Sequence, residues 1–239
     1  RNAYLVLKFD FSKVAPSAAR VEQSFFINVL DTANMFLEKY KDYLEADVNK
    51  TIAEWKTYGN PSDLLSSLLT LCSIKNQKLY LIIDEYDNFA NTILSTDGKL
   101  DYEKLTHGEG FFRAFFNVIK AGTASSGAPV SRLFMSGVSP ITLDDVTSGF
   151  NIGIPISTDA AVNEIMGFNE QEVTTMIEYY RQAGKIQHET PYLLEIMSRW
   201  YNHYRFSKDS PSGLYNSTQV LYFLNEYFKN HRVPDDLID

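Results

Sequence analysis

Apolar residues recur along the chain in two different periods, and this pattern predicts strands and helices in alternation. The segment AYLVLKFDFS (3–12) is almost continuously apolar at first and then alternates every second residue, which is typical of a strand. Its apolar face carries Leu7, Phe9 and Phe11, and its polar face carries Lys8, Asp10 and Ser12. The apolar run in LYLIIDEYDNF (79–89) and the segment RLFMSGVSPI (132–141) predict two more strands, and NIGIPIS (151–157) is a candidate for a further short one.

Helices are predicted where apolar residues return at three- and four-residue steps. These steps run from 18 to 44, start again after Asn60-Pro61, and cover FFRAFFNVIK (111–120), where Gly122 is the expected stop. Asn60 can accept from the first-turn amides, and Pro61 loses no hydrogen bond at the first helical position, so the pair predicts a helix start. The connections are expected to be polar: a helix or linker at 45–59, a surface excursion at 95–110 and a loop at 123–130.

After these elements the pattern becomes helical only. Asn169 and Glu172 in GFNEQEV are spaced as in a capping box. Thr190-Pro191 is expected to start a helix as the earlier Asn-Pro pair does, and NSTQVLYFLNEYF (216–228) predicts a last amphipathic helix.

The order of the predicted elements indicates the α/β class. Strands separated by helices pair in parallel through right-handed crossovers. Parallel strands are covered on both faces, which explains why LYLII shows no polar alternation. We therefore expect a parallel sheet flanked by helices over residues 1–158 and a helical subdomain over residues 159–239.

Composition and charge narrow the classes of function. The chain has 239 residues, 44% of them hydrophobic, which is ample for a large core. Its net charge of −8 does not attract a phosphate backbone through the average field, and no Lys/Arg run is present, so we expect no direct binding of nucleic acid. Cys72 is the only cysteine, which excludes an internal disulfide and favours a reducing compartment.

The ends and the hydropathy of the chain lead to two further expectations. We find no signal peptide and no apolar run that approaches the ~20 residues of a membrane span, so we expect no membrane segment and a cytoplasmic location, or a nuclear one in a eukaryote. The sequence begins with Arg1 and enters a strand-like stretch at once, so we expect a fragment that lacks its own N-terminal part.

The acidic end of LYLIIDEYDNF is the first candidate for chemistry. In an open parallel sheet, ligands bind beyond the carboxyl ends of the strands, where Asp84 and Glu85 fall. An apolar strand followed by Asp and Glu is the Walker B layout, in which the aspartate holds Mg²⁺ and the glutamate orients or polarises the attacking water. Two alternatives stay open: an ordinary acidic loop at the rim of the sheet, and a metal-dependent hydrolase that uses Asp84, Glu85 and Asp87.

The segment MSGVSP supplies the second candidate group. Because it ends the next predicted strand, Ser136 is the first and Ser139 the second candidate to contact the γ-phosphate or the water. Gly137, Ser139 and Pro140 also make an ordinary turn, which is the alternative. Arg132 is a candidate arginine finger toward a neighbouring subunit, or else a solvated loop residue.

The phosphate-binding motif GxxxxGK[ST] does not occur in this sequence. That loop is what cradles the β- and γ-phosphates, and without it Asp84 has no Ser/Thr partner on the metal. We therefore expect the chain as given not to hydrolyse ATP.

Six blocks, taken in order, are similar to those of one known family. They are LVLKFDFS, LYLIIDEYDNFAN, LFMSGVSPITLDDVTSGFNI, GFNEQEV, WYNHYRF and LYNSTQVLYFLNEY. This resembles the AAA-ATPase-like family of P-loop proteins, which is often found N-terminal to a PD-(D/E)XK-type nuclease domain. The resemblance implies an ATP-binding core with Asp84 and Glu85 at the Walker B positions, and a C-terminal helical lid. It also implies that a phosphate-binding strand, loop and helix lie upstream of Arg1, with that strand central between the one at 132–137 and the one near 151–157. A nuclease domain or a second copy of the chain, in a homo-oligomer, is the candidate partner.

The block RWYNHYRF (199–206) is the most specific feature of the lid that the resemblance implies. In such ATPases a lid arginine can reach the nucleotide phosphates, and Arg205 matches that position, with Arg199 as the weaker candidate. The alternative is that the aromatic residues of this block are core and that Arg205 stacks on a ring. His188 and His203 are isolated, so no His/Cys metal cluster is expected.

Three hypotheses of function follow, in order of support. The first is a regulatory ATPase module that is incomplete here. The second is a non-catalytic interaction module, derived from an NTPase, that regulates a partner or a fused nuclease domain. The third is a two-metal hydrolase, which ranks last because neighbouring residues of a strand point to opposite faces.

Overall fold

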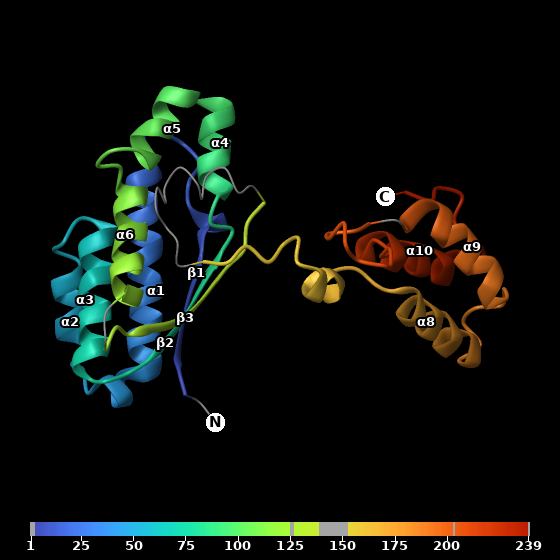
Figure 1. Ribbon diagram of the computed structural model, residues 1–239, viewed down its shortest axis with the longest axis horizontal. Helices are drawn as coiled ribbons and strands as arrows, with labels where there is room; N and C mark the ends of the chain where they lie inside the picture. Colours follow the sequence, from blue (N-terminus) through green and yellow to red (C-terminus); the bar gives the residue numbers. More distant parts are fainter. Residues whose placement is uncertain (1–2, 125–126, 139–152, 203, 239) are drawn as a thin grey trace. The chain divides into compact units, whose positions relative to one another are not determined.

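Three parallel strands in the order β1-β2-β3 form the sheet of the N-terminal part of the chain (Figure 1). The computed structural model describes residues 3–124, 127–138, 153–202 and 204–238. The strands are β1 Leu5–Asp10, β2 Leu79–Asp84 and β3 Val130–Met135. Asp10 pairs with Asp84 and Ile83 with Met135, so the carboxyl ends of the three strands meet at one edge. This sheet confirms the predicted α/β class.

The chain divides into two compact units, Arg1–Gly153 and Ile154–Asp239. The boundary expected after residue 158 stays a prediction. The candidate strand at 151–157 is wrong where it can be judged, because residues 153–157 are not in a strand; residues 151 and 152 lie outside the described part.

Only one face of the sheet is buried among the described residues. Its side chains are at most 6% exposed: Leu5, Leu7, Phe9, Leu79, Leu81 and Ile83. On the opposite face Val6 is 38% and Phe134 is 44% exposed, while Tyr80 and Ile82 are half-buried. The expectation that both faces are covered is therefore wrong for the described residues. Both crossovers step across the sheet in the same direction, so right-handed connections place their helices on a single face.

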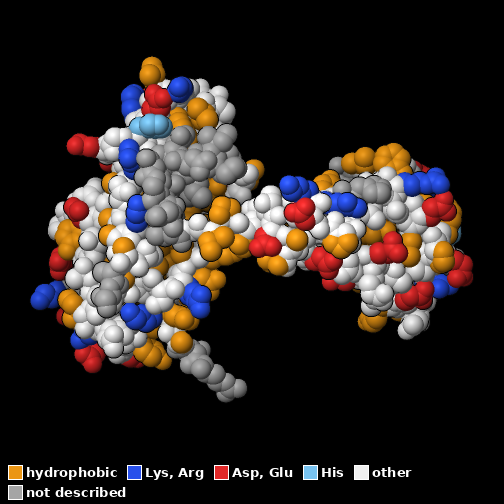
Figure 2. All heavy atoms as spheres, viewed as in Figure 1, with side chains coloured by type: hydrophobic (Ala, Val, Ile, Leu, Met, Phe, Trp, Pro, Cys, Tyr) orange, Lys and Arg blue, Asp and Glu red, His pale blue; other side chains and the backbone are white. Residues whose placement is uncertain are grey.

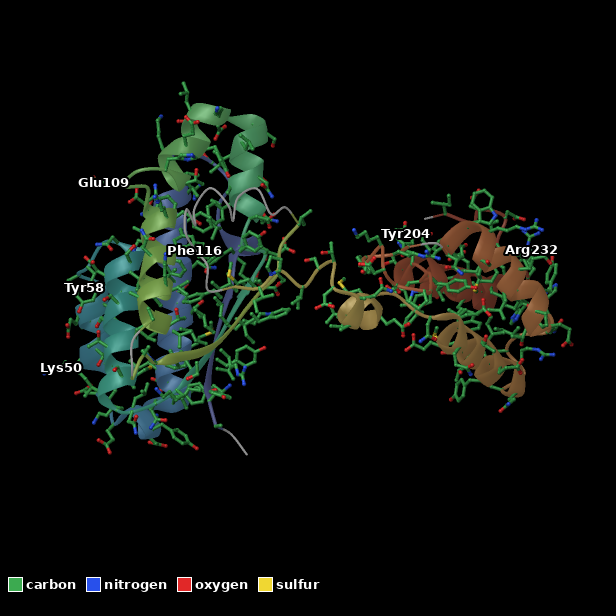
Figure 3. All side chains as sticks on the ribbon, in the orientation of Figure 1. Lys50, Tyr58, Glu109, Phe116, Tyr204 and Arg232 are labelled. Atoms are coloured by element: carbon green, nitrogen blue, oxygen red, sulfur yellow. The ribbon has the colours of Figure 1, made fainter. Side chains whose placement is uncertain are left out.

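In the part of the chain that the structure describes, four α-helices of the N-terminal unit cover that buried face as a layer, and two more lie at the carboxyl ends of the strands. They are α1 Val21–Leu44, α2 Val48–Trp55, α3 Pro61–Ile74, α4 Asn88–Thr96, α5 Lys99–Thr106 and α6 Phe111–Ala124. Figure 1 shows α1, α2, α3 and α6 on one side of the strands, with α4 and α5 beyond the carboxyl ends. Phe116 lies inside this layer, whereas Lys50 and Tyr58 lie on its outer side (Figure 3). Phe11 and Phe25 centre the aromatic core, with ring centroids 4.7 Å apart.

The predicted loops at 95–110 and 123–130 are both partly helical. The segment 95–110 contains the end of α4 and all of α5, because Tyr102 and Leu105 bury one face of α5 at 3% and 6% exposure. Gly122 does not end α6, which continues to Ala124. A Cβ at Gly122 would lie 2.8 Å from the Leu69 side chain, so this glycine serves the close packing of α6 on α3.

The start of α3 follows the prediction. The Asn60 side chain accepts a hydrogen bond from the Asp63 amide at 2.8 Å, and Pro61 occupies the first helical position. The cap satisfies one of the amides that have no partner inside the helix.

The C-terminal unit is built from helices in the part that the structure describes. They are η2 Ala160–Ile165, α8 Glu170–Gln182, α9 Thr190–Tyr201 and α10 Ser217–Asn230. The capping box of Asn169 and Glu172 is present as predicted. The helix start predicted at Thr190-Pro191 is confirmed, since α9 begins at Thr190. Thr190 is not the cap, because Glu189 is the N-cap residue and the Thr190 hydroxyl donates to Glu178 on α8. No described helix is both long enough and apolar enough to cross a bilayer.

The two outer strands of the sheet differ in whether side chains bond the backbone groups on their outer edges. On β1 the Val6 amide donates to the Tyr40 hydroxyl at 3.2 Å, and the Asp10 carbonyl accepts from the Asn28 amide group at 3.0 Å. On β3 the Ser136 amide donates to Ile83 of β2, so by alternation the amide and carbonyl of Met135 point away from the sheet. Among the described residues, nothing bonds these Met135 groups. Within the described part of the chain, the edge of β1 is therefore partly occupied by side chains, whereas the edge of β3 is open at Met135.

Candidate functional site

Asp84 and Ser136 meet at the carboxyl edge of the sheet. Asp84 is the last residue of the central strand β2, and Ser136 directly follows β3. The Ser136 hydroxyl donates to Asp84 Oδ1 at 2.6 Å. Parallel pairing produces this contact, because Met135 lies opposite Ile83 and the next residue of each strand then falls side by side. The structure thus brings together the two side chains that the sequence singled out on separate strands.

The second Asp84 oxygen has a cationic neighbour from β1. Lys8 Nζ lies 3.0 Å from Asp84 Oδ2, and both side chains are partly exposed. The Ser136 hydroxyl first, and the Lys8 ammonium next, lower the pKa of Asp84 below its usual value. Asp10, opposite Asp84, also has a lowered pKa because the Ser12 hydroxyl donates to it at 2.6 Å. Asp84 is therefore a carboxylate that stays ionised at neutral pH.

The lowered pKa of Asp84 predicts a pH-dependent effect of Ser136→Ala. A carboxyl whose folded pKa lies below its unfolded value of 3.8 stabilises the fold above that value, and the stabilisation is lost as pH falls through the folded pKa. We expect Ser136→Ala to lower the free energy of unfolding most at neutral pH, with the difference from wild type shrinking below about pH 4. Urea unfolding at pH 3 to 7 measures this; a difference that does not change with pH would contradict it.

Glu85 occupies the tight turn that follows β2. Its backbone is left-handed, with φ of 54°, a conformation that costs a residue with a Cβ roughly 1–2 kcal/mol. Its carboxylate accepts from the Asn88 side chain at 3.2 Å, at the start of α4. The strained backbone takes Glu85 out of the strand, next to Asp84 at the same edge. Such strain is often found at functional sites.

Asp87 lies two residues further on and is completely buried. Both of its carboxylate oxygens accept from the Val138 amide at 3.1 Å, and Oδ2 also accepts from the Asn91 side chain at 2.7 Å. The two-metal hypothesis uses Asp87 as a metal ligand beside Asp84 and Glu85. A carboxylate that is buried and already hydrogen-bonded does not suit that role. Among the described residues no group of three or more His, Cys, Asp or Glu side chains is placed to hold a metal.

The other predicted site residues lie elsewhere. Arg132 is an exposed residue within β3 opposite Tyr80, roughly 13 Å along the strand from the level of Asp84. Arg205 is exposed in the C-terminal unit, after α9, and Arg199 pairs with Glu195 on that helix. Ser139 lies outside the described residues.

Lys8 and Asp10 belong to this edge but were not singled out as site residues. Their signal was present in the sequence, since both lie on the polar face of the first strand. Only the register that pairs Asp10 with Asp84 brings that face to the acidic end of β2.

Two of the hollows among the described residues lie away from Asp84. One hollow of about 630 Å³ lies near the starts of α1 and α6, and another of about 400 Å³ lies between α8 and α10. Asp84, Glu85 and Ser136 line neither of them. The face of the sheet that carries Val6 and Phe134, called the bare face below, is partly exposed among the described residues.

The family model described as "Predicted AAA-ATPase" matches residues 1–147. The chain belongs to the AAA-ATPase-like family. No curated protein and no solved structure matches the chain. The match lies within the N-terminal unit, so the membership of this AAA-ATPase-like chain rests on the unit that carries Asp84, Glu85 and Ser136. Family membership supports nucleotide binding as the general activity.

Proposed function

We propose that the N-terminal unit is the nucleotide-binding core of an ATPase, with Asp84 as the Mg²⁺-holding residue and Glu85 as the residue that orients the attacking water. The observation that carries the proposal is the contact of Ser136 with Asp84 at the end of the central strand. Hydroxyl and carboxylate groups from adjacent strands are suited to phosphoryl transfer, where positioning and charge stabilisation supply most of the catalysis.

The residues at this edge fit Mg²⁺. The ion takes oxygen ligands and is bound through one or two carboxylates while it keeps several waters, which suits a single partly exposed aspartate on a rigid strand. Asp84 would hold the ion, and the Ser136 hydroxyl would keep that carboxylate oriented. Lys8 already offers Asp84 a positive charge, so this carboxylate is arranged to face a cation. When bound, Mg²⁺ would neutralise the charge of the nucleotide phosphates.

We further propose that a strand, a phosphate-binding loop and a helix complete the core beside β3. Two features support this. The outward groups of Met135 offer an open edge, and Val6 and Phe134 leave the second face of the sheet apolar and exposed. A strand placed beside β3 and connected to β1 would cross the sheet in the opposite direction from the other crossovers. Its helix would then lie on the bare face, by the same rule of handedness.

The C-terminal unit is proposed to be the lid, with Arg205 as the residue that reaches the phosphates. The support is its helical character and the exposure of Arg205 in the loop after α9. On the face shown in Figure 2, acidic and basic side chains are interspersed over the surface. This distribution is consistent with a nucleotide, rather than a nucleic acid, as the ligand.

Nucleotide titration of the whole gene product that contains these 239 residues tests the proposal. We expect Asp84→Asn to raise the dissociation constant of the Mg²⁺–nucleotide complex at least ~10-fold, and to leave binding unchanged when EDTA removes the metal. Asp42→Asn, an exposed position on α1, is the matched control. Equal affinities of the two variants would overturn the assignment of Asp84. Absence of nucleotide binding by the wild-type product would favour the non-catalytic interaction module.

A further inference from the structure

Asp87 connects the turn after β2 to the chain that leaves β3. It is 0% exposed, and both of its oxygens lie 3.1 Å from the Val138 amide nitrogen. Val138 is two residues beyond Ser136, and its own side chain is 85% exposed. The contact therefore holds the backbone of this loop and not the Val138 side chain.

Gly137 fits between the two segments because it has no Cβ. A Cβ at this position would lie 2.4 Å from Asp87 Oδ1 and 2.5 Å from the ring of Tyr86. Such distances are below any normal contact, so the loop approaches the turn as closely as only glycine permits. The close approach is what allows the Val138 amide to reach the buried carboxylate.

Both backbone groups of Ser136, the residue before Gly137, form hydrogen bonds. The Ser136 amide donates to the Ile83 carbonyl at 2.9 Å, and the Ser136 carbonyl accepts from the Tyr86 amide at 3.1 Å. With Asp87 bonded to Val138, the backbone is fixed just before and just after the serine. The Ser136 hydroxyl then lies 2.6 Å from Asp84 Oδ1.

Burying the Asp87 carboxylate costs free energy. Burying an ionised group is unfavourable unless hydrogen bonds compensate it, and a neutral side chain would fill this position at lower cost. Charge-assisted hydrogen bonds to backbone amides are shorter and stronger than neutral ones, so they hold a loop more rigidly. The use of Asp at position 87 therefore points to a requirement for precise placement of the loop.

We infer that Asp87 is a positioning residue, which sets the Ser136 hydroxyl on Asp84 by holding the backbone of Gly137 and Val138. The functional meaning of this inference rests on the proposed function, since it makes Asp87 the support of the Mg²⁺-holding carboxylate. The arrangement itself does not depend on any ligand.

A set of double-mutant cycles tests the inference. Unfolding by urea is measured for wild type, Ser136→Ala, Asp84→Asn and the double variant, and the same four are made with Asp87→Asn and with Asp87→Ala. In the wild-type background we expect the two side chains to be coupled by roughly fivefold in the unfolding equilibrium constant. The coupling should fall to half or less, on a logarithmic scale, with Asp87→Asn, which keeps the shape but loses the charge. It should vanish with Asp87→Ala.

A merely structural role of Asp87 would lower the stability of all four variants and leave the coupling unchanged. An undiminished coupling with Asp87→Asn therefore overturns the inference, even if Asp87→Ala does not fold. Asn91→Ala is the matched control, because it removes a partner of the same carboxylate but not the contact with Val138. This variant should retain the coupling.

These measurements use no nucleotide or metal, so they separate the inference from the proposed function. If the coupling depends on Asp87 but the whole gene product binds no Mg²⁺–nucleotide, the positioning role stands and the proposed function fails. If binding occurs but the coupling is indifferent to Asp87, the proposed function stands and the inference fails.

Discussion

Replacement of Gly137 by alanine is expected to lower the free energy of unfolding of the N-terminal unit by about 3 kcal/mol. The new methyl group would overlap the Asp87 carboxylate and the Tyr86 ring, and overpacking of this kind costs roughly 1–3 kcal/mol. If the loop moved to relieve this overlap, the Val138 amide would leave the buried Asp87 carboxylate. The carboxylate would lose a hydrogen bond, which adds a cost of roughly 1–3 kcal/mol. Urea unfolding of the chain measures the effect.

Gly153→Ala is the control for this prediction. No described residue lies within 4 Å of the position that its Cβ would take, and its φ is not left-handed, so the substitution should be close to neutral. Equal stability of the Gly137 and Gly153 variants would show that the loop can shift without penalty. The close packing of Tyr86, Gly137 and Asp87 would then not be a constraint on the fold.

Substitution of Glu85 by glutamine is expected to reduce the turnover number for ATP hydrolysis by the whole gene product at least ~100-fold, with binding of the Mg²⁺–nucleotide complex retained. A group that orients or deprotonates the attacking water typically contributes 10²–10⁴-fold. Glutamine keeps the size of the side chain and can still accept from Asn88, so the turn should stay folded. Phosphate release under saturating nucleotide measures the turnover.

Glu103→Gln, on the partly exposed surface of α5, is the matched control and should hydrolyse ATP as wild type does. Turnover of the Glu85 variant within a factor of two of this control would contradict the role of Glu85. Binding without hydrolysis by the wild-type product would instead favour a module that uses the nucleotide, or the fold alone, for regulation.

The strands and most helices of the N-terminal unit could be predicted because their periodicity is strong. β1 alternates cleanly, and Asn60 caps α3 with a bond that residue type and spacing already suggest. α4 was not predicted as a helix, and α5 was missed because its buried face rests mainly on Tyr102 and Leu105 among polar neighbours. Gly122 was misread because composition cannot distinguish a helix stop from a site of close helix packing.

The candidate site could be predicted only in part. Asp84 and Ser136 were found because each ends an apolar strand, and the parallel register then brings them together. The roles of Asp87 and Lys8 depend on which residues face one another across strands, which a single sequence does not reveal. The bare face was missed because LYLII is apolar on both sides, whether or not a second layer covers it.

Side chains occupy hydrogen-bonding groups on the outer edge of β1, and this difference from β3 affects how copies of this chain can associate. Tyr40 and Asn28 occupy one amide and one carbonyl on the far side of β1, so a strand that added to that side would have to displace both side chains. If no further strand occupies the edge of β3, that edge is the less obstructed one among the described residues, and two copies paired there about a two-fold axis would align their β3 strands in opposite directions. Such a pair would keep only the two β1 edges, which Tyr40 and Asn28 partly cover.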